Sequence, residues 1–246
     1  MELVSLGKQG QVTIPKGILR KLAIPDEAPL VIEASADGAI VLRQAVVFPV
    51  EIYSEARVKE FTESAKITPR EEARVEAALK RRKIKKRWMR LFLDANVLFS
   101  AAYMDKGRPG SLFRLAEAQL CELIASPYAI EEARRNLAFK RVERLSEFAR
   151  LTAVLTICPE PSKEYIEWAL AQGLVLKDAP ILAAASQEKV NLLVTGDRTD
   201  FGHLYRRILR GVAVLAAAEA LDRMLSAAGL RLGSTTLALL HGHRMQ

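Results

Sequence analysis

Acidic side chains stand at four places in the second half of the chain where a short apolar segment meets a turn or a helix. They are Asp94 after residues 91–93, Glu131 and Glu132 after residues 121–125, Asp178 before residues 179–185, and Asp197 and Asp200 after residues 192–195. Open α/β sheets bind ligands beyond the carboxyl ends of their strands, so acids at such ends can meet in one crevice. Each acid alone would be explained as a helix cap or a turn residue. Four equivalent placements favour a common site.

Carboxylates that converge in one crevice repel each other and raise each other's pKa. A hard divalent cation relieves that repulsion, and oxygen-only ligands suit Mg²⁺ or Mn²⁺, which also accept phosphate oxygens. Such a metal turns bound water into a nucleophile and offsets charge on a phosphate under attack. The acids therefore predict hydrolysis of a phosphodiester.

Residues 91 to about 221 resemble a PIN-domain nuclease, the family of the VapC-type toxins. The matching motifs are Leu93-Asp94-Ala-Asn96, Glu132-Ala-Arg-Arg-Asn-Leu137, Lys177-Asp178-Ala-Pro-Ile-Leu-Ala-Ala184, and Thr195-Gly-Asp197 with Asp200-Phe201. In the second motif the acid stands five residues before Leu137, which selects Glu132 over Glu131. The resemblance implies an α/β fold with a mostly parallel sheet flanked by helices, and the apolar runs suggest five strands.

The resemblance also implies roles for the acids. Asp94, Glu132, Asp178 and Asp197 would be catalytic and hold Mg²⁺ or Mn²⁺, with Asp197 ranked before Asp200 as a ligand. Asn96 and Thr195 would orient carboxylates or waters. Cleavage of RNA rather than DNA is implied by the family and not by any residue.

The first 45 residues read as a small β-rich unit. The expected strands are residues 3–6, 11–14, 30–33 and 39–42, with a helix that starts at Pro15 and runs through Leu22. Asp37-Gly38, between the last two strands, is a strong hairpin signal. So small a unit has too little core to stand alone, and dimerisation is the usual remedy.

The stretch from Gln9 to Lys16, QGQVTIPK, followed by Arg20, resembles the AbrB-type swapped-hairpin DNA-binding domain. In that family two chains interleave their hairpins and present paired basic loops to DNA. The resemblance implies a homodimer that contacts DNA through Lys8, Gln11, Lys16 and Arg20. Residues 1–43 are nearly neutral, however, so a dimerisation module without DNA binding is the alternative.

Residues 46–90 are expected to form a helical connection. Tyr53, Arg57 and Phe61 are four residues apart on one helical face, and Thr68 to Glu71 form a capping box that starts a second helix. The first pattern resembles the tail by which AbrB-type antitoxins hold PIN toxins. We expect these three residues to inhibit the nuclease, in cis or in trans, with Arg57 or a junction cation paired with the acids. A plain helical linker is the alternative.

The formal net charge of the chain is +8, and the eleven residues from Lys80 to Arg90 alone hold eight cations and no acid. That stretch predicts contact with nucleic acid or with an acidic pocket. Cys121 and Cys158 are isolated in apolar runs and predict reduced thiols. No apolar run is long enough to span a bilayer, so a cytoplasmic protein without a membrane partner is expected.

The sequence thus predicts a swapped-hairpin domain at residues 1–45, a tail and basic linker at 46–90, and a nuclease at 91–246. The leading hypothesis is a metal-dependent endoribonuclease, self-inhibited by an antitoxin-like segment that also binds operator-like DNA. One alternative is a DNA-binding transcription regulator whose PIN half is an inactive assembly module. Another is a DNA nuclease directed by its DNA-binding domain.

Overall fold

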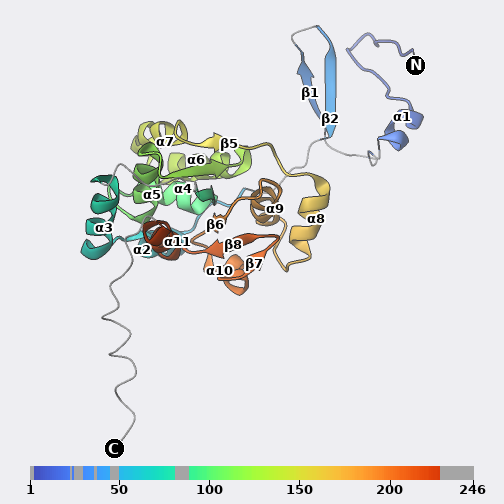
Figure 1. Cartoon of the computed structure of the whole chain (residues 1–246). Helices are drawn as coiled ribbons and strands as arrows, with labels where there is room; N and C mark the ends of the chain where they lie inside the picture. Colours follow the sequence, from blue (N-terminus) through green and yellow to red (C-terminus); the bar gives the residue numbers. More distant parts are fainter. Residues whose placement is uncertain are drawn as a thin grey trace, which may run out of the picture. The chain divides into compact units, whose positions relative to one another are not determined.

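A computed structural model of the chain describes residues 3–22, 24, 30–35, 38–44, 50–80 and 89–227. The chain separates into two units, Met1–Pro49 and Val50–Gln246 (Figure 1). Most of the basic junction expected from Lys80 to Arg90, namely residues 81–88, lies outside the described residues. Asp37 of the expected hairpin turn also lies outside them.

The smaller unit contains an antiparallel hairpin and a short helix. Strands β1 (Leu30–Ala34) and β2 (Ile40–Gln44) pair, and α1 (Lys16–Lys21) begins after Pro15. The strands expected at residues 3–6 and 11–14 are wrong for this single chain, because neither has a strand partner among the described residues. A turn closed by the Gly7 N–H on the Gln11 carbonyl (2.8 Å) joins them instead.

The smaller unit has no buried core among its described residues. Large apolar side chains lie open to solvent, including Leu6 at 70%, Ile32 at 68% and Ile40 at 73% exposure. A lone β-rich unit that exposes its apolar side chains cannot balance the entropy lost on ordering its chain. Its stability therefore requires another apolar surface.

The larger unit is built on one sheet whose order among the described strands is β5-β4-β3-β6-β8-β7. The strands are β3 (Met89–Leu93), β4 (Cys121–Ala125), β5 (Thr156–Ile157), β6 (Leu192–Val194), β7 (Ile208–Leu209) and β8 (Val212–Leu215). All neighbours are parallel except β7 and β8. The predicted α/β fold with a mostly parallel, helix-flanked sheet is confirmed, but the sheet has six strands rather than five.

The sixth strand, β7, was missed because it is two residues long. Its two-residue connection to β8 has positive φ at both positions, 47° at Arg210 and 86° at Gly211. Two consecutive residues with positive φ make the turn whose twist matches an antiparallel pair, and glycine adopts that conformation without a steric penalty. The hairpin adds an antiparallel edge to an otherwise parallel sheet.

Helices cover the sheet and connect its strands. They are α2 (Glu55–Ala65), α3 (Pro69–Lys80), α4 (Ala95–Tyr103), α5 (Arg108–Glu117), α6 (Pro127–Lys140), α7 (Leu145–Thr152), α8 (Lys163–Leu170), α9 (Ala179–Gln187), α10 (Arg198–Phe201) and α11 (Ala217–Ala227). Helix α4 is almost wholly buried and packs against α2, α5, α6 and α7. It follows β3 directly, so its position fixes the carboxyl end of that strand.

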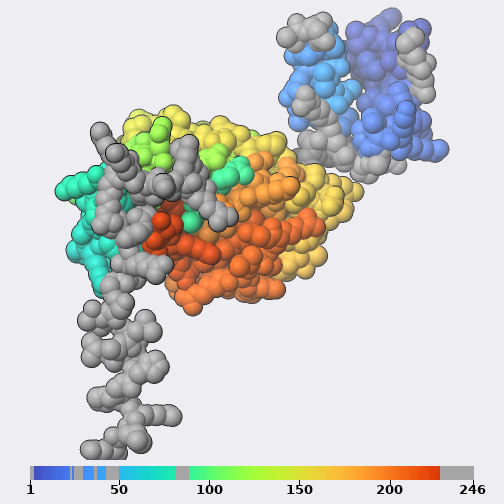
Figure 2. All heavy atoms as spheres, in the orientation of Figure 1, coloured from blue at the N-terminus to red at the C-terminus, as the bar shows by residue number. Residues whose placement is uncertain are grey.

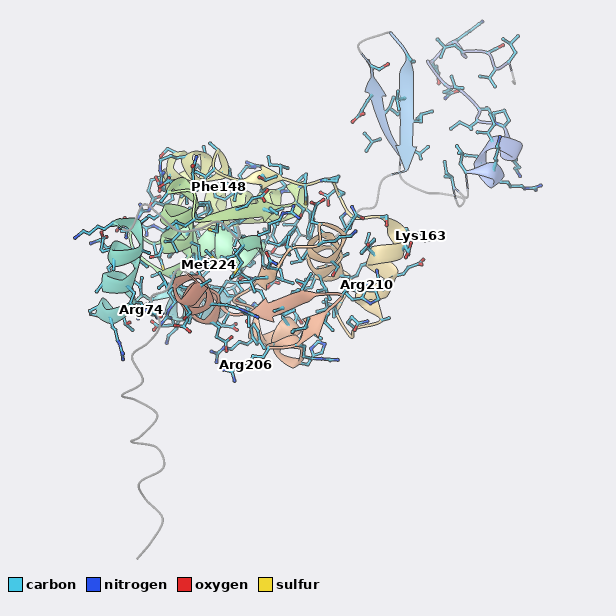
Figure 3. All side chains as sticks on the ribbon, in the orientation of Figure 1. Arg74, Phe148, Lys163, Arg206, Arg210 and Met224 are labelled. Atoms are coloured by element: carbon cyan, nitrogen blue, oxygen red, sulfur yellow. The ribbon has the colours of Figure 1, made fainter. Side chains whose placement is uncertain are left out.

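Residues 50–80 belong to the larger unit, and the spheres of α3 form one continuous surface with it (Figure 2). The predicted capping box is confirmed, because Glu71 accepts from the Thr68 N–H at 2.8 Å and Thr68 Oγ1 accepts from the Glu71 N–H at 3.2 Å. Arg74 on α3 pairs with Asp222 of α11 at 2.7 Å (Figure 3). Tyr53 lies just before α2 rather than on it, since Ser54 is the N-cap.

Within the described residues, no helix combines the length and the apolar character that a bilayer crossing requires.

Candidate active site

The strand order of the larger sheet reverses between β3 and β6. From β3 the chain proceeds outward to β4 and β5, whereas β6 proceeds outward to β8 on the other side. Parallel sheets form a crevice where their order reverses, beyond the carboxyl ends of the two central strands. Asp94 follows β3, and residues 195–197 follow β6. The fold therefore places two of the predicted motifs side by side.

Asp94 is 5% exposed and accepts three hydrogen bonds. One oxygen accepts from the Ala95 N–H, and the other accepts from Asn96 Nδ2 and Thr195 Oγ1, all at 2.6 Å. Asn96 Oδ1 also accepts from the Gly196 N–H at 2.6 Å. Side chains after β3 and β6 thus bind each other across the crevice.

Asp178, Asp197 and Asp200 form a second part of the site, in which one carboxylate oxygen of each lies within 4.8 Å of the others. Asp178 precedes α9, and the other two flank the start of α10. Asp178 Oδ2 is buried and has no hydrogen-bond partner. A buried oxygen of this kind is costly unless a proton or a cation satisfies it.

Glu132 lies on α6, and its carboxylate faces residues 50–66 rather than the three aspartates. Its Oε1 accepts from the Tyr53 hydroxyl at 2.8 Å. The Tyr53 ring packs edge-on against Phe61 and Phe99, with centroids 5.0 and 5.3 Å apart. Tyr53 and Phe61 are 2% and 1% exposed. Two of the expected tail residues are therefore buried in the same core as α4.

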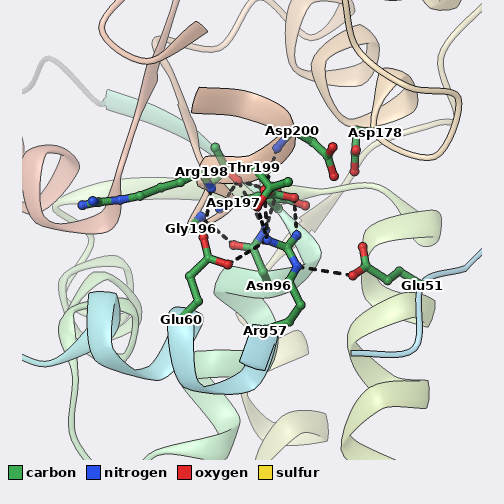
Figure 4. Close-up of polar contacts among 12 residues, drawn as sticks. Glu51, Arg57, Glu60, Asn96, Asp178, Gly196, Asp197, Arg198, Thr199 and Asp200 are labelled. Carbon is green, nitrogen blue, oxygen red and sulfur yellow. Dashed lines mark hydrogen bonds and ion pairs between the residues drawn. The ribbon is translucent and has the colours of Figure 1, made fainter. Parts of the chain in front are cut away.

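Arg57, the third expected tail residue, reaches from α2 into the acidic site (Figure 4). Its guanidinium donates to both oxygens of Asp197, from Nη2 at 2.5 Å and from Nη1 at 3.2 Å. Glu51 and Glu60 hold the same guanidinium from the sides, at 3.3 and 2.9 Å. A two-pronged contact of this kind is the strong form of an Arg–carboxylate pair.

Lys177 is a site residue that the sequence prediction did not single out. Its Nζ lies 2.8 Å from Asp200 Oδ2, 3.5 Å from Asp178 Oδ2 and 2.5 Å from Glu51 Oε2. Its position directly before Asp178 was the one sequence feature that could have indicated a role in the site. The Lys177 carbonyl accepts from the Tyr128 hydroxyl at 2.9 Å, which fixes the backbone.

Asn136 was also missed. It is fully buried on α6, one turn after Glu132. Its Oδ1 accepts from the Tyr53 N–H at 2.7 Å, and its Nδ2 donates to the Glu51 carbonyl at 2.7 Å. One amide side chain therefore binds the backbone on both sides of Ile52. Spacing of four residues from Glu132 placed it on the same helical face.

Burial and mutual repulsion raise the pKa of three acids in the crevice. Burial, with the charge of Asp197, raises the pKa of Asp94 to about 6. Burial and the charge of Asp94 raise the pKa of Glu132 to about 7 and that of Asp178 to about 8. For Asp200, burial acts upward, but the hydrogen bond and the charge of Lys177, together with the charge of Arg57 and other smaller effects, outweigh it and lower the pKa.

Burial acts on the pKa of a cation in the opposite direction from its action on an acid. Burial alone would lower the pKa of Arg57, but its hydrogen bonds to Asp197 more than compensate and raise it. Burial likewise opposes the charge on Lys177, whereas Asp200 and Glu51 raise its pKa. Both side chains are therefore kept charged by the carboxylates that they contact.

The chemistry of the site fits a divalent cation. The donors are carboxylate oxygens, three of which come within ligand range of one another, and one buried oxygen of Asp178 lacks a hydrogen bond. Oxygen-only sets of this kind suit Mg²⁺ and Mn²⁺. Asp94 adjoins the set electrostatically, whereas Glu132 is turned toward Tyr53.

The four residues expected to touch DNA lie in the smaller unit. Lys8, Gln11, Lys16 and Arg20 are all exposed, with Lys16 and Arg20 on α1. Their side chains are exposed within that unit.

Comparison with known proteins identifies part of the larger unit. Residues 90–199 match the family described as PIN domain. A comparison with curated proteins found no match. Among solved structures, VapBC2 from Rickettsia felis, bound to a DNA fragment from their promoter, is 18% identical with a TM-score of 0.41, over 52% of this chain and 98% of that one.

Two further structures have similar values. PAE2754 from Pyrobaculum aerophilum is 19% identical with a TM-score of 0.43, over 57% of this chain and 99% of that one. FitAcB from Neisseria gonorrhoeae is 18% identical with a TM-score of 0.37, over 52% of this chain and 98% of that one.

The raised pKa values predict that the metal-free protein loses stability as pH rises from about 5.5 to 8. In that window the folded chain holds protons on Asp94, Glu132 and Asp178 that the unfolded chain has released, so the free energy of unfolding falls with pH. Acids whose pKa is lowered, such as Glu131 at about 2, are deprotonated in both the folded and the unfolded chain throughout this range, so they do not change the slope.

Urea unfolding in EDTA at successive pH values measures the effect. Each group contributes a slope of up to about 1.4 kcal/mol per pH unit while it titrates. Asp178→Asn should flatten the curve between pH 7 and 8, whereas Asp105→Asn, at an exposed carboxyl beside Arg144, should leave it unchanged. A curve that stays level from pH 5.5 to 8 would contradict the buried acid cluster.

Proposed function

Because residues 90–199 form a PIN domain and PIN domains are generally nucleases, we propose that the larger unit is a metal-dependent endoribonuclease closed by its own residues 50–66. The observation that supports it best is the acidic set of Asp178, Asp197 and Asp200, beside Asp94 at the reversal of the sheet. Asp178 Oδ2 in this set has no hydrogen bond and only a 3.5 Å ion pair with Lys177. Mg²⁺ or Mn²⁺, when bound, would supply an activated water and offset charge on the scissile phosphate.

The side chains of the site have two proposed roles, metal binding and the orientation of a carboxylate. Asp178 and Asp197 would hold the cation, with Asp200 beside them and with Asp94 and Glu132 as the neighbouring acids. Asn96 and Thr195 keep the Asp94 carboxylate in a fixed orientation through their hydrogen bonds. No step requires a protein nucleophile.

Closure of the site follows from the contacts of residues 50–66. Arg57 covers both oxygens of Asp197, and Tyr53 takes an oxygen of Glu132, so two proposed metal-site acids are engaged by the tail. Phe61 lies against the loop at Gly196, where an added Cβ would meet its ring at 3.6 Å and Asn96 Oδ1 at 3.0 Å. Because the tail is tethered, its effective concentration is on the order of millimolar, so a weak contact suffices.

The smaller unit is proposed to be an AbrB-type swapped-hairpin domain that dimerises and binds operator-like DNA. Its exposed apolar side chains and the unpaired segments 3–6 and 11–14 are what a unit completed by a second copy would show in one chain. Exposed Lys8, Gln11, Lys16 and Arg20 provide the DNA contacts.

The proposed chemistry predicts cleavage of labelled RNA, but not of duplex DNA, with Mn²⁺ and its complete loss in EDTA. Asp178→Asn should reduce cleavage about 100-fold or more, because the metal's charge stabilisation contributes several kcal/mol. This variant is cleaner than Asp94→Asn, since Asp94 accepts three hydrogen bonds that an amide cannot all accept. Undiminished cleavage by Asp178→Asn would remove the metal-site assignment, and absence of any cleavage would favour an inactive assembly module.

Closure by the tail predicts that Arg57→Ala in the full chain raises RNA cleavage at least about tenfold. Removal of this half-buried cation leaves Asp197, 4% exposed at its side chain, without its guanidinium partner and costs the docked state about 2–5 kcal/mol. Hydrogen exchange over residues 50–65 should become faster at the same time.

Arg74→Ala is the matched control, because it breaks a contact between α3 and Asp222 of α11, away from the acids. It should change cleavage by less than twofold. Faster exchange in Arg57→Ala without faster cleavage would show that the tail does not inhibit.

Dimerisation predicts twice the chain mass by light scattering at micromolar concentration. Substitution of both Lys16 and Arg20 by Gln should weaken binding to operator-like duplex DNA. The log–log salt slope should fall by about 0.9 for each phosphate that the variant no longer neutralises. A monomer at these concentrations would contradict the swapped domain, and an unchanged slope would leave a dimerisation module without DNA binding.

A further inference from the structure

Lys177 pairs with both Asp178 and Asp200, and it does so as the one cation among the described residues 89–227. Unlike Arg57, it belongs to the nuclease itself, and the Tyr128 hydroxyl on its carbonyl fixes its backbone. Its Nζ makes its shortest contact, 2.5 Å, with Glu51 Oε2 of the tail. Lys177 therefore stays in the site when the tail leaves, and only Asp178 and Asp200 then remain as its carboxylate partners.

Glu51 pairs with two cations from a segment that is neither helix nor strand. One carboxylate oxygen meets Lys177, the other meets Arg57 Nε at 3.3 Å, and the Glu51 carbonyl accepts from Asn136 Nδ2. Residues 51–53 have no helical structure, and Asn136 binds them through backbone groups alone. A carboxylate that projects from a backbone-bound segment beside the acidic crevice and pairs with cations resembles one phosphate in a nucleic acid strand.

Electrostatics require such a cation. The acids Asp94, Glu132, Asp178, Asp197 and Asp200 gather in and around the crevice, and their field repels a polyanion. A metal ion offsets part of that charge at the scissile phosphate, but adjacent phosphates need a partner of their own. An ammonium group binds phosphate as a point charge, with charge-assisted hydrogen bonds.

We propose that Lys177 binds a phosphate of the RNA substrate at the position where Glu51 lies in the closed protein. Glu51 thus acts as a phosphate surrogate, and its removal exposes the site for the substrate strand. This assignment rests on the proposed ribonuclease function. The competing account is that Lys177 only balances the charge of Asp178 and Asp200.

The test uses full-length chains that carry Arg57→Ala to open the site, with Mn²⁺ and a labelled single-stranded RNA. Lys177→Gln is compared with Lys177→Arg and with Lys140→Gln. Lys140 is the matched control, because it also pairs with a tail carboxylate, Glu55, at 2.5 Å but makes no contact with the acid cluster. Thermal unfolding and Mn²⁺ affinity are measured for each chain.

Lys177→Gln should raise KM about 10- to 100-fold, the change expected when one charge-assisted hydrogen bond is removed. Its kcat and Mn²⁺ affinity should stay within about threefold. Lys177→Arg should restore most of the KM, and Lys140→Gln should leave it unchanged. The salt dependence of KM should also be shallower in Lys177→Gln, since one phosphate is no longer paired with a cation.

An unchanged KM in Lys177→Gln, with altered Mn²⁺ affinity or kcat, would overturn the phosphate assignment and leave the ribonuclease intact. An equal rise of KM in Lys140→Gln would also overturn it, because general charge would then explain the effect. If the Arg57→Ala chain cleaves no RNA with Mn²⁺, the ribonuclease assignment fails and the role of Lys177 fails with it.

Discussion

Mutual repulsion among carboxylates is the constraint on which the larger unit depends. The reversal of the sheet between β3 and β6 brings acids from separate segments into one low-dielectric crevice. The acids are stabilised in different ways. Asp94 receives hydrogen bonds, Asp197 receives a guanidinium, Asp200 receives an ammonium group, and Asp178 keeps one oxygen without a hydrogen-bond partner.

Two of the partners that balance these acids come from residues outside the PIN match. Arg57 and Tyr53 both belong to residues 50–66. Arg57 pairs with Asp197 and lies over the Phe61 ring, whereas Tyr53 donates a hydrogen bond to Glu132 and packs against Phe99. Tyr53 and Phe61 share the aromatic core of Phe99 on α4, the helix that Asp94 caps. Because the same helix supports both the acid and the segment that covers it, site and cover are parts of one packed structure.

The acids were predictable from sequence because parallel strands place their ends at one edge, so the run before Asp94 and the run before Asp197 indicated the crevice. The spacing of Tyr53, Arg57 and Phe61 likewise indicated a shared face. The sequence did not predict the site residues whose roles depend on contacts between distant segments. Lys177 and Asn136 acquire their roles only when residues 51–53 lie against them, over 80 positions away in sequence. Neither has a local pattern that distinguishes it.

Short secondary-structure elements were not predicted for a different reason. Strand β7 has two residues, too few for any alternation to register, and only the turn at Arg210 and Gly211 marks it. The segments 3–6 and 11–14 show the converse case. Their composition favours strands, but a strand forms only where a second backbone is available to pair, and one chain does not provide it.

The separation of 140 positions between Arg57 and Asp197 has a consequence for how the protein is made. A ribosome completes the segment that carries Arg57 before it adds the first of the acids, and it adds Asp197 after the others except Asp200. Every newly finished crevice therefore emerges with its cover already attached and in equal number. One chain therefore fixes the ratio of residues 50–66 to the acidic crevice at one to one.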